Sequence, residues 1–176
     1  SEMDTDVSRL QEISERFSRM GSVPKMEPVE IRDFLENLKS YFERRLPSGA
    51  KEMVLSVDSQ EVTAKTSPTL LSWVLENLIK NAIDSIDKGD GKVTLKSEKM
   101  DNDVSISVSD NGRGIARRDW KNVFRPGYTT KERGWGVGLS MVKRIVEDFL
   151  DGSIQIKSSE VGKGTTIEIR LPSFAS

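Results

Sequence analysis

The sequence predicts an α+β domain of two layers, in which helices cover one face of a mostly antiparallel sheet. Residues 92–99 and 103–109 alternate apolar and polar side chains around a polar turn, and residues 153–158 and 165–171 do so later in the chain. Each pair is typical of a β-hairpin. Segments with apolar residues at every third or fourth position separate the hairpins, which is the period of an amphipathic helix. Because hairpins are antiparallel, a wholly parallel, doubly wound sheet is disfavoured.

The expected helices share this period and lie at residues 1–20, 27–45, 68–86, 117–123 and 137–150. Ser67 is a good N-cap and Pro68 suits the first helical position. Glycine and proline at residues 21–28 predict a linker after the first helix. The apolar stripe of that helix is short. It fits packing on the same domain, or the end of a longer two- or four-helix bundle.

Two weaker strands are expected at residues 53–57 and 61–65, the second as a partner of the first. Later in the chain, residues 125–135 form a polar, glycine-containing loop. A loop of that length is unusual as a simple connection and is typical of a lid over a binding site.

The composition excludes several classes of protein. The 176 residues are 35% hydrophobic and 31% charged with a net charge of −1, which indicates a soluble domain that does not bind nucleic acid or a membrane surface. No apolar run approaches the roughly 20 residues of a membrane span, and the polar N-terminus has no signal-peptide core. A cytoplasmic location is expected, with any membrane attachment through a missing part of the parent protein. Without cysteine or histidine, thiolate sites, serine–histidine triads and zinc-hydrolase sites are excluded.

Asn77 and Asn81 interrupt the apolar helix that begins at Ser67, and Asp84 follows near the same face. Residues four apart lie one helical turn apart. The strip is compatible with ordinary solvent exposure. It is also compatible with a pocket, because Mg²⁺ prefers oxygen ligands and needs few from the protein when phosphates supply others.

Residues 110–114 (Asp-Asn-Gly-Arg-Gly) directly follow a predicted strand. The aspartate could accept hydrogen bonds from a ligand such as the adenine amino group, and the glycines permit close approach to the main chain. The same sequence is also a common tight turn. The residue pattern alone leaves both interpretations open.

Residues 134–140 (Gly-Trp-Gly-Val-Gly-Leu-Ser) lead into a helix. Free amides at a helix N-terminus bind phosphate. The segment matches neither a Walker A loop nor a dinucleotide-binding fingerprint. Residues 162–166 (Gly-Lys-Gly-Thr-Thr) form an ordinary hairpin turn when taken alone.

In their order and spacing, these elements resemble the catalytic ATP-binding domain of sensor histidine kinases, within the wider ATPase family that includes gyrase and the Hsp90 chaperone. The similar segments are residues 77–82 (N box), 110–115 (first glycine box), 123–131 (F box and lid), 134–139 (second glycine box) and Gly164-Thr165 (closing Gly-Thr element). The resemblance covers residues 28–172 and implies the α/β sandwich of that ATPase type, known as the Bergerat fold.

The resemblance implies a site for ATP and Mg²⁺. Asn81 would supply the Mg²⁺ ligand, Asp110 would accept from the adenine amino group, and Thr165 would assist Asp110 directly or through water. Amides of residues 136–139 would bind the phosphates, and Phe124 would anchor the lid. The nucleotide-binding positions implied in this way are Asn77, Asn81, Asp84, Asp110, Gly112, Gly114, Ile115, Phe124, Thr130, Lys131, Arg133, Gly134, Gly136, Val137, Gly138, Leu139 and Thr165.

The implied catalytic residues are Asn77, Asn81 and Lys131, and Arg133 would join Lys131 in reaching the phosphates from the lid. In gyrase-like hydrolases the position of Asn77 holds a glutamate that activates water. An amide is not a useful base at neutral pH, so phosphoryl transfer is favoured over hydrolysis. Glu76 points about 100° away around the helix and is a poor substitute.

One stretch departs from the family pattern. Many such kinases continue the N box with Ala-x-Lys-Tyr, whereas residues 82–85 here are Ala-Ile-Asp-Ser. A phosphate-contacting lysine at position 84 is therefore missing. Similar endings resemble nitrogen-regulator-like kinases, without assigning a subfamily.

The resemblance also implies an organisation and a reaction. Residues 1–22 would be the end of a dimerisation helix with its linker, and residues 23–176 the catalytic domain. The γ-phosphoryl group of ATP would pass to a histidine on a dimerisation domain absent from this chain, and then to a response regulator; the full-length protein would be a homodimer. Three alternatives stay open: an ATP-hydrolysing clamp, an anti-sigma-type serine kinase, and a nonenzymatic nucleotide-binding module.

Overall fold

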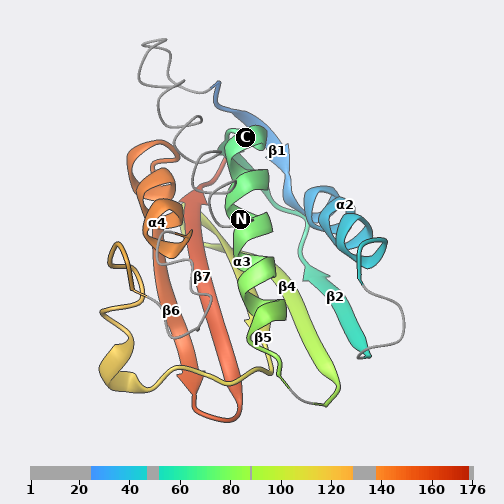
Figure 1. The fold of residues 1–176 in the computed structure, drawn as a ribbon. Helices are drawn as coiled ribbons and strands as arrows, with labels where there is room; N and C mark the ends of the chain where they lie inside the picture. Colours follow the sequence, from blue (N-terminus) through green and yellow to red (C-terminus); the bar gives the residue numbers. More distant parts are fainter. Residues whose placement is uncertain (1–24, 47–51, 88, 129–137, 175–176) are drawn as a thin grey trace.

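The computed structural model describes residues 25–46, 52–87, 89–128 and 138–174, and Figure 1 shows its fold. In chain order the elements are β1 (Glu27–Glu30), α2 (Ile31–Glu43), β2 (Met53–Ser59), β3 (Thr63–Thr66), α3 (Pro68–Asp84), β4 (Gly91–Met100), β5 (Asp103–Asp110), the 3-10 helix η1 (Arg117–Asp119), α4 (Gly138–Asp148), β6 (Ser153–Glu160) and β7 (Gly164–Pro172). The helix expected at residues 1–20 lies outside the described residues. Within the described ranges, no helix is long and apolar enough to cross a membrane.

Five strands form the main sheet in the order β2-β4-β5-β7-β6. The β4–β5 and β6–β7 pairs are antiparallel hairpins, as predicted. β5 and β7 are also antiparallel, whereas β2 runs parallel to β4. Helices α2, α3 and α4 lie on the same face of this sheet (Figure 1). The predicted two-layer α+β sandwich with a mostly antiparallel sheet is confirmed.

The helix predicted at residues 27–45 is wrong at its start, where Glu27–Glu30 form strand β1. This strand pairs antiparallel with β3 in a separate two-stranded sheet. The Glu30 carboxylate then accepts hydrogen bonds from the amides of Arg32 (3.2 Å) and Asp33 (2.8 Å), which caps α2. Four residues are too few to show a strand period in the sequence, so the distant partner strand decides the conformation.

The predicted pairing of residues 53–57 with residues 61–65 is also wrong. β2 pairs with β4 and β3 pairs with β1. The chain leaves the main sheet after Ser59, whose carbonyl oxygen accepts two hydrogen bonds from the Arg32 guanidinium, at 3.0 and 2.8 Å. A tertiary contact from α2 therefore overrides the local hairpin that the sequence favours.

The short helix predicted at residues 117–123 is present only as the 3-10 turn Arg117–Asp119. Hydrogen-bonded turns follow it, and Trp120 Nε1 donates to the carbonyl oxygen of Ile115 at 3.0 Å. The bond ties this segment back to the loop after β5. The hydrogen bond between Trp120 and Ile115 therefore stabilises a series of turns here in place of the predicted helix.

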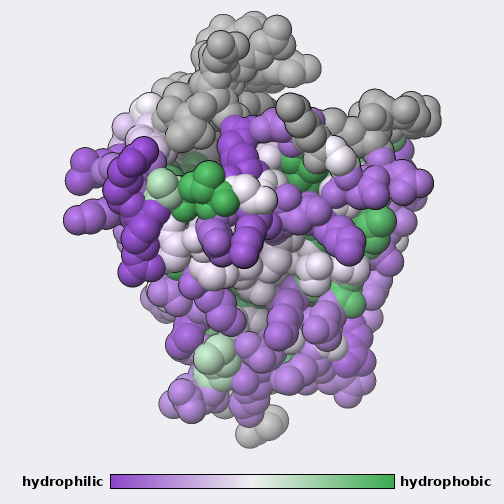
Figure 2. Space-filling model, turned by 90° about the horizontal axis from the view of Figure 1, so that it is seen from below, coloured by the Kyte–Doolittle hydropathy of each residue, from purple (hydrophilic) through white to green (hydrophobic). Residues whose placement is uncertain are grey.

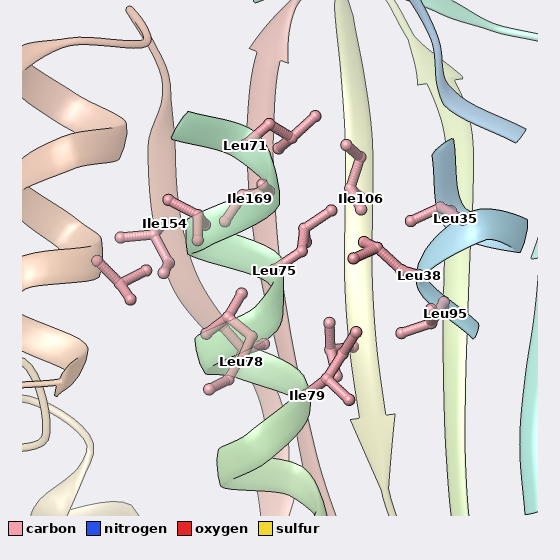
Figure 3. Packing of buried hydrophobic residues seen from close by; sticks show 14 of the residues in the cluster. Leu35, Leu38, Leu71, Leu75, Leu78, Ile79, Leu95, Ile106, Ile154 and Ile169 are labelled. Atoms are coloured by element: carbon pink, nitrogen blue, oxygen red, sulfur yellow. The ribbon is translucent and has the colours of Figure 1, made fainter. Parts of the chain in front are cut away.

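Helix α3 is the centre of the core. Leu71, Leu75 and Leu78 project from it toward the sheet, where Ile106 of β5 and Ile169 of β7 lie (Figure 3). The buried residues of α3 are Leu70, Leu71, Val74, Leu75, Leu78, Ile79 and Ala82. This burial fixes the rotation of the helix about its axis. It therefore also fixes where the polar strip of α3 points.

The sheet face away from the helices carries a buried carboxylate. Glu168 is 1% exposed and accepts hydrogen bonds from Ser105 Oγ (2.7 Å), Gln155 Nε2 (3.0 Å) and Arg170 Nε (3.1 Å). Lys157 Nζ lies 3.8 Å from its Oε2. Burial raises the pKa of Glu168, but the three hydrogen bonds and the charge of Arg170 outweigh it and hold the pKa below its usual range.

Glu168→Gln is expected to lower the free energy of unfolding by about 1–3 kcal/mol at neutral pH, because the amide places N–H groups against the donors that surround it. The folded-state pKa is lowered, so the carboxylate stabilises the fold above its unfolded pKa. That contribution is lost as the pH falls through the folded-state pKa. Urea titrations at neutral and acid pH should show that the variant has a lower free energy of unfolding than the wild type, and that the difference becomes smaller in acid. Glu160→Gln, an exposed position on the same hairpin, is the control, and equal deficits in the two variants would contradict the prediction.

Candidate nucleotide-binding site

The segments singled out by their glycines and polar residues meet at one end of the molecule. The C-terminal ends of α3, β5 and β6 and the start of β7 all lie there (bottom of Figure 1). Seen from that end, the surface is mainly hydrophilic, with apolar side chains in small separate areas (Figure 2). Such a surface suits a polar or charged ligand.

Asn77 and Asn81 are half-buried on α3, one turn apart. Asn77 Nδ2 donates to the carbonyl oxygen of Trp73 at 2.7 Å, a bond that engages the amide nitrogen and not the amide oxygen. Ser72 Oγ donates to Glu76 Oε1 at 3.3 Å, so this carboxylate is engaged by a neighbour on α3. The polar strip therefore offers amide oxygens.

Asp110 is the last residue of β5 and lies directly opposite Thr165 of β7. Its Oδ1 accepts hydrogen bonds from the amides of Gly112 (2.8 Å) and Thr165 (3.3 Å). Asn111 holds the loop to β4, because its Oδ1 accepts from the amide of Lys92 at 2.8 Å. The carboxylate is thus fixed in place by main-chain donors.

Two glycines of this loop and the first residue of β7 are packed too closely for any side chain. A Cβ at Gly112 would collide with the hydroxyl and carbonyl oxygens of Ser85, and a Cβ at Gly114 with the carbonyl of Glu160. A Cβ at Gly164 would collide with the carbonyl of Asp110. Gly114 and Gly164 also have positive φ, at +73° and +126°. The three glycines let α3, the loop and β7 meet around Asp110.

Sequence reasoning did not find Ser85 and Arg113, which hold the loop to the end of α3. The amide of Arg113 donates to the carbonyl of Ser85 at 2.9 Å. Its guanidinium donates to the carbonyl of Asp84 at 2.9 Å and to Asp87 Oδ1 at 3.2 Å. Asp84 was predicted to bind nucleotide; its backbone anchors the loop and its side chain is exposed. No local sequence signal marks these contacts, because they join separate segments.

Burial raises the pKa of Asp110, and this effect prevails over the hydrogen bonds from Gly112, Ser85 and Thr165 and over the charge of Arg113, which lower it. A half-buried acceptor with a raised pKa beside closely packed glycines is typical of a ligand-binding site. Only the ionised carboxylate presents acceptors alone on both of its oxygens.

Ile115 reaches the site through Ser159, a residue that sequence reasoning also missed. The amide of Ile115 donates to Ser159 Oγ at 2.7 Å, and Ser159 Oγ lies 2.7 Å from Thr165 Oγ1. Ser159 follows an irregularity in the β6–β7 register between Ile156 and Ser158. The alternation of apolar and polar residues therefore does not reveal on which face of the sheet Ser159 lies.

Phe124 packs against the hydrophobic core, and Lys143 Nζ of α4 lies 5.7 Å from its ring centroid. Gly138 begins α4 and Leu139 follows it, half-buried against the core. The other predicted lid and phosphate positions lie outside the described residues: Thr130, Lys131, Arg133, Gly134, Gly136 and Val137.

The residues fit a nucleotide with a divalent cation. The half-buried Asp110 carboxylate is an acceptor for a base amino group, and Gly112 and Gly114 let the loop pack closely against Ser85 and Glu160 beside it. In the described part of the chain, no three acidic side chains gather into a metal site. A bound Mg²⁺ would then depend on an amide oxygen such as that of Asn81, completed by phosphate oxygens and water.

A family model described as "Histidine kinase-, DNA gyrase B-, and HSP90-like ATPase" matches residues 66–174, which is more than half of the chain. The chain belongs to this ATPase family. The match extends from the last residue of β3 to just beyond β7, so it includes every described segment of the site.

Among curated relatives, sporulation kinase D of Bacillus subtilis is 32% identical over an alignment of 178 residues. The alignment covers 99% of this chain but 34% of that kinase. The nucleotide-free catalytic domain of histidine kinase ThkA is 26% identical with a TM-score of 0.71, covering 84% of this chain and 95% of that domain. The complex of ThkA with response regulator TrrA has the same fold, with 23% identity and a TM-score of 0.74 over 97% of this chain and 49% of the other. The chain therefore matches a catalytic domain at nearly full length and a whole kinase in part.

Proposed function

We propose that this chain is the ATP- and Mg²⁺-binding catalytic domain of a sensor histidine kinase. Residues 23–176 would form that domain, and residues 1–22 the end of the dimerisation helix with its linker. The observation that carries the proposal is the Asp110 acceptor, held by main-chain donors in a glycine cradle beside α3. In this ATPase family such a site suits the adenine amino group, which supplies only donors to a carboxylate.

Binding would divide among three parts of the site. Asp110 would accept from adenine, in the position that close packing of Gly112 against Ser85 and of Gly114 against Glu160 gives to the loop. The amides at the start of α4, at Gly138 and Leu139, would bind phosphate oxygens. Mg²⁺, held in part by Asn81, would neutralise phosphate charge. Phe124 would anchor the lid, whose residues from Thr130 to Val137 would complete the phosphate site.

The reaction would be phosphoryl transfer. A bond from an imidazole nitrogen to the γ-phosphorus forms as the bond to the β-phosphate oxygen breaks, and ADP leaves with the electron pair. Asn77 supplies no base to activate water, and Glu76 is engaged by Ser72. Positioning of the acceptor then decides the outcome, which favours transfer over hydrolysis.

The acceptor must come from another segment, because this sequence contains no histidine. We place it on a dimerisation domain of the whole protein, which would act as a homodimer in the cytoplasm. A response regulator would receive the phosphoryl group next. The solved complex of ThkA with TrrA supports that partner for a kinase of this fold.

Asn81→Ala is expected to reduce transfer of labelled phosphoryl from Mg·ATP to a histidine-bearing dimerisation domain by about 100-fold, as for loss of one charge-stabilising group. Asn37→Ala, an exposed asparagine on α2, is the matched control and should leave the rate unchanged. Label should be lost in acid, as expected of phosphohistidine. Acid-stable label would indicate a serine kinase, and steady hydrolysis without the acceptor would indicate an ATP-driven clamp.

A further inference from the structure

Ser159, Thr165 and Asp110 form a row across three neighbouring strands. Ser159 of β6 lies opposite Thr165 of β7, and Thr165 lies opposite Asp110 of β5. Ile156 pairs with Ile167 and Ser158 with Thr166, so Lys157 is an extra residue in β6. This β-bulge brings Ser159, and not Ser158, opposite Thr165. Cross-strand partners share a face of the sheet, so the three side chains are neighbours.

The Ser159 hydroxyl makes three short contacts with two segments of the site. The amide of Ile115 donates to it at 2.7 Å, and it donates to the carbonyl oxygen of Gly164 at 3.1 Å. Thr165 Oγ1 lies 2.7 Å away, where either hydroxyl could be the donor. Ser159 is half-buried and Thr165 is 8% exposed, so water competes little for these groups.

Counting protons assigns the direction of the ambiguous bond. A serine hydroxyl has one proton and two lone pairs. The carbonyl of Gly164 can only accept, so it takes the proton of Ser159. The amide of Ile115 fills one lone pair. All three contacts are then hydrogen bonds only if Thr165 donates to the second lone pair of Ser159, which leaves Thr165 Oγ1 with lone pairs alone for any other partner.

We propose that Ser159 determines nucleobase specificity by holding the hydroxyl proton of Thr165, so that Thr165 and Asp110 together present only acceptors to a bound base. The inference rests on the proposed ATP site. Adenine carries an amino group with two N–H donors, which such a row satisfies. Hypoxanthine carries a carbonyl oxygen at that position, which would face acceptors and remain unpaired.

The test compares Mg·ATP with Mg·ITP, the inosine nucleotide, by calorimetry on the whole chain. Wild type should prefer ATP by about 100-fold or more. Ser159→Ala frees the Thr165 hydroxyl to donate to the hypoxanthine carbonyl, so the ratio of the two affinities should narrow by about tenfold, the equivalent of one hydrogen bond. Ser159→Thr keeps the hydroxyl and should restore the preference. Ser158→Ala, one residue away on the exposed side of the bulge, should leave the ratio unchanged.

Equal weakening of both nucleotides in Ser159→Ala, or an unchanged ratio, would overturn the inference and leave Ser159 as a structural residue. If the alanine variant does not fold, Ser159→Cys keeps the volume with weak hydrogen bonding and should give the same narrowing. A wild-type chain that binds neither nucleotide would end the proposed function and this inference together. If the wild type binds ATP but the Ser159 variants keep the same ratio of ATP to ITP affinity, the inference alone would fail and the proposed function would stand.

Discussion

Asp110→Asn is expected to weaken Mg·ATP binding by about 100-fold or more while leaving the free energy of unfolding unchanged or higher. The variant replaces a charged acceptor by an amide whose N–H groups would face the adenine amino group. Loss of a hydrogen bond to a charged group costs about 1.5–3 kcal/mol, and the unpaired donors add to it. Since about 1.4 kcal/mol is tenfold in affinity, the two effects together reach that loss.

The opposite effect on stability follows from the pKa of Asp110. Burial raises that pKa in the folded chain, so the folded state binds more protons than the unfolded state between the two pKa values. Stability therefore falls as the pH rises through that window, and the ionised carboxylate opposes folding above it. Asparagine removes this charge, and its Oδ1 can still accept from the amides of Gly112 and Thr165.

Calorimetry and urea unfolding at neutral pH measure the two quantities separately. The same pKa predicts that the affinity of the wild-type chain for ATP falls as the pH drops through the pKa of Asp110, and that the binding of the Asn variant does not show this acid limb. Asp58→Asn, at an exposed position on β2, is the control for both measurements. A large loss of stability in Asp110→Asn would show that the carboxylate supports the fold, and would contradict its assignment as a ligand group.

Local signals account for the parts of the fold that the sequence predicts. The alternation on either side of residues 100–102 and 161–163 marks both hairpins, and Ser67 with Pro68 marks the start of α3; the Ser67 hydroxyl accepts from the amide of Leu70 at 3.3 Å. Each signal lies within a few residues of the element it specifies. The two hairpins of the main sheet and the start of α3 were therefore accessible without a structure.

Contacts between distant segments were not accessible in the same way. β1 is a strand because β3 pairs with it, and β2 joins β4 in parallel, which no turn residue encodes. In the candidate site, the motifs predict Asp110 and Thr165, and the structure places the two residues opposite each other. Ser159 could not be predicted, because its partner Ile115 lies 44 residues away. In addition, the bulge changes which face of the sheet the residues after it occupy. Ser85 and Arg113 join α3 to the loop in the same long-range manner.

Gly164→Ala is expected to lower the free energy of unfolding by about 3 kcal/mol or more, and to weaken ATP binding with it. Two causes combine at this position. The φ of +126° is essentially confined to glycine, and a Cβ would collide with the carbonyl of Asp110 and the Cα of Asn111. Both obstacles are backbone atoms, at the end of β5 and the start of the loop, so relief requires that β7 move away from Asp110.

Two other glycines separate these causes. Gly162 has a φ of +82° with nothing within 4 Å of a Cβ, so Gly162→Ala carries backbone strain alone and should cost about 1–2 kcal/mol. Gly138 of α4 has open space and no positive φ, so Gly138→Ala should not lower stability, because alanine favours a helix. In urea, the free energy of unfolding should be much lower for Gly164→Ala than for Gly162→Ala, and unreduced for Gly138→Ala. Equal losses at positions 164 and 162 would mean that β7 shifts without cost, and the close contact between β7 and Asp110 would then not be what holds the carboxylate in place.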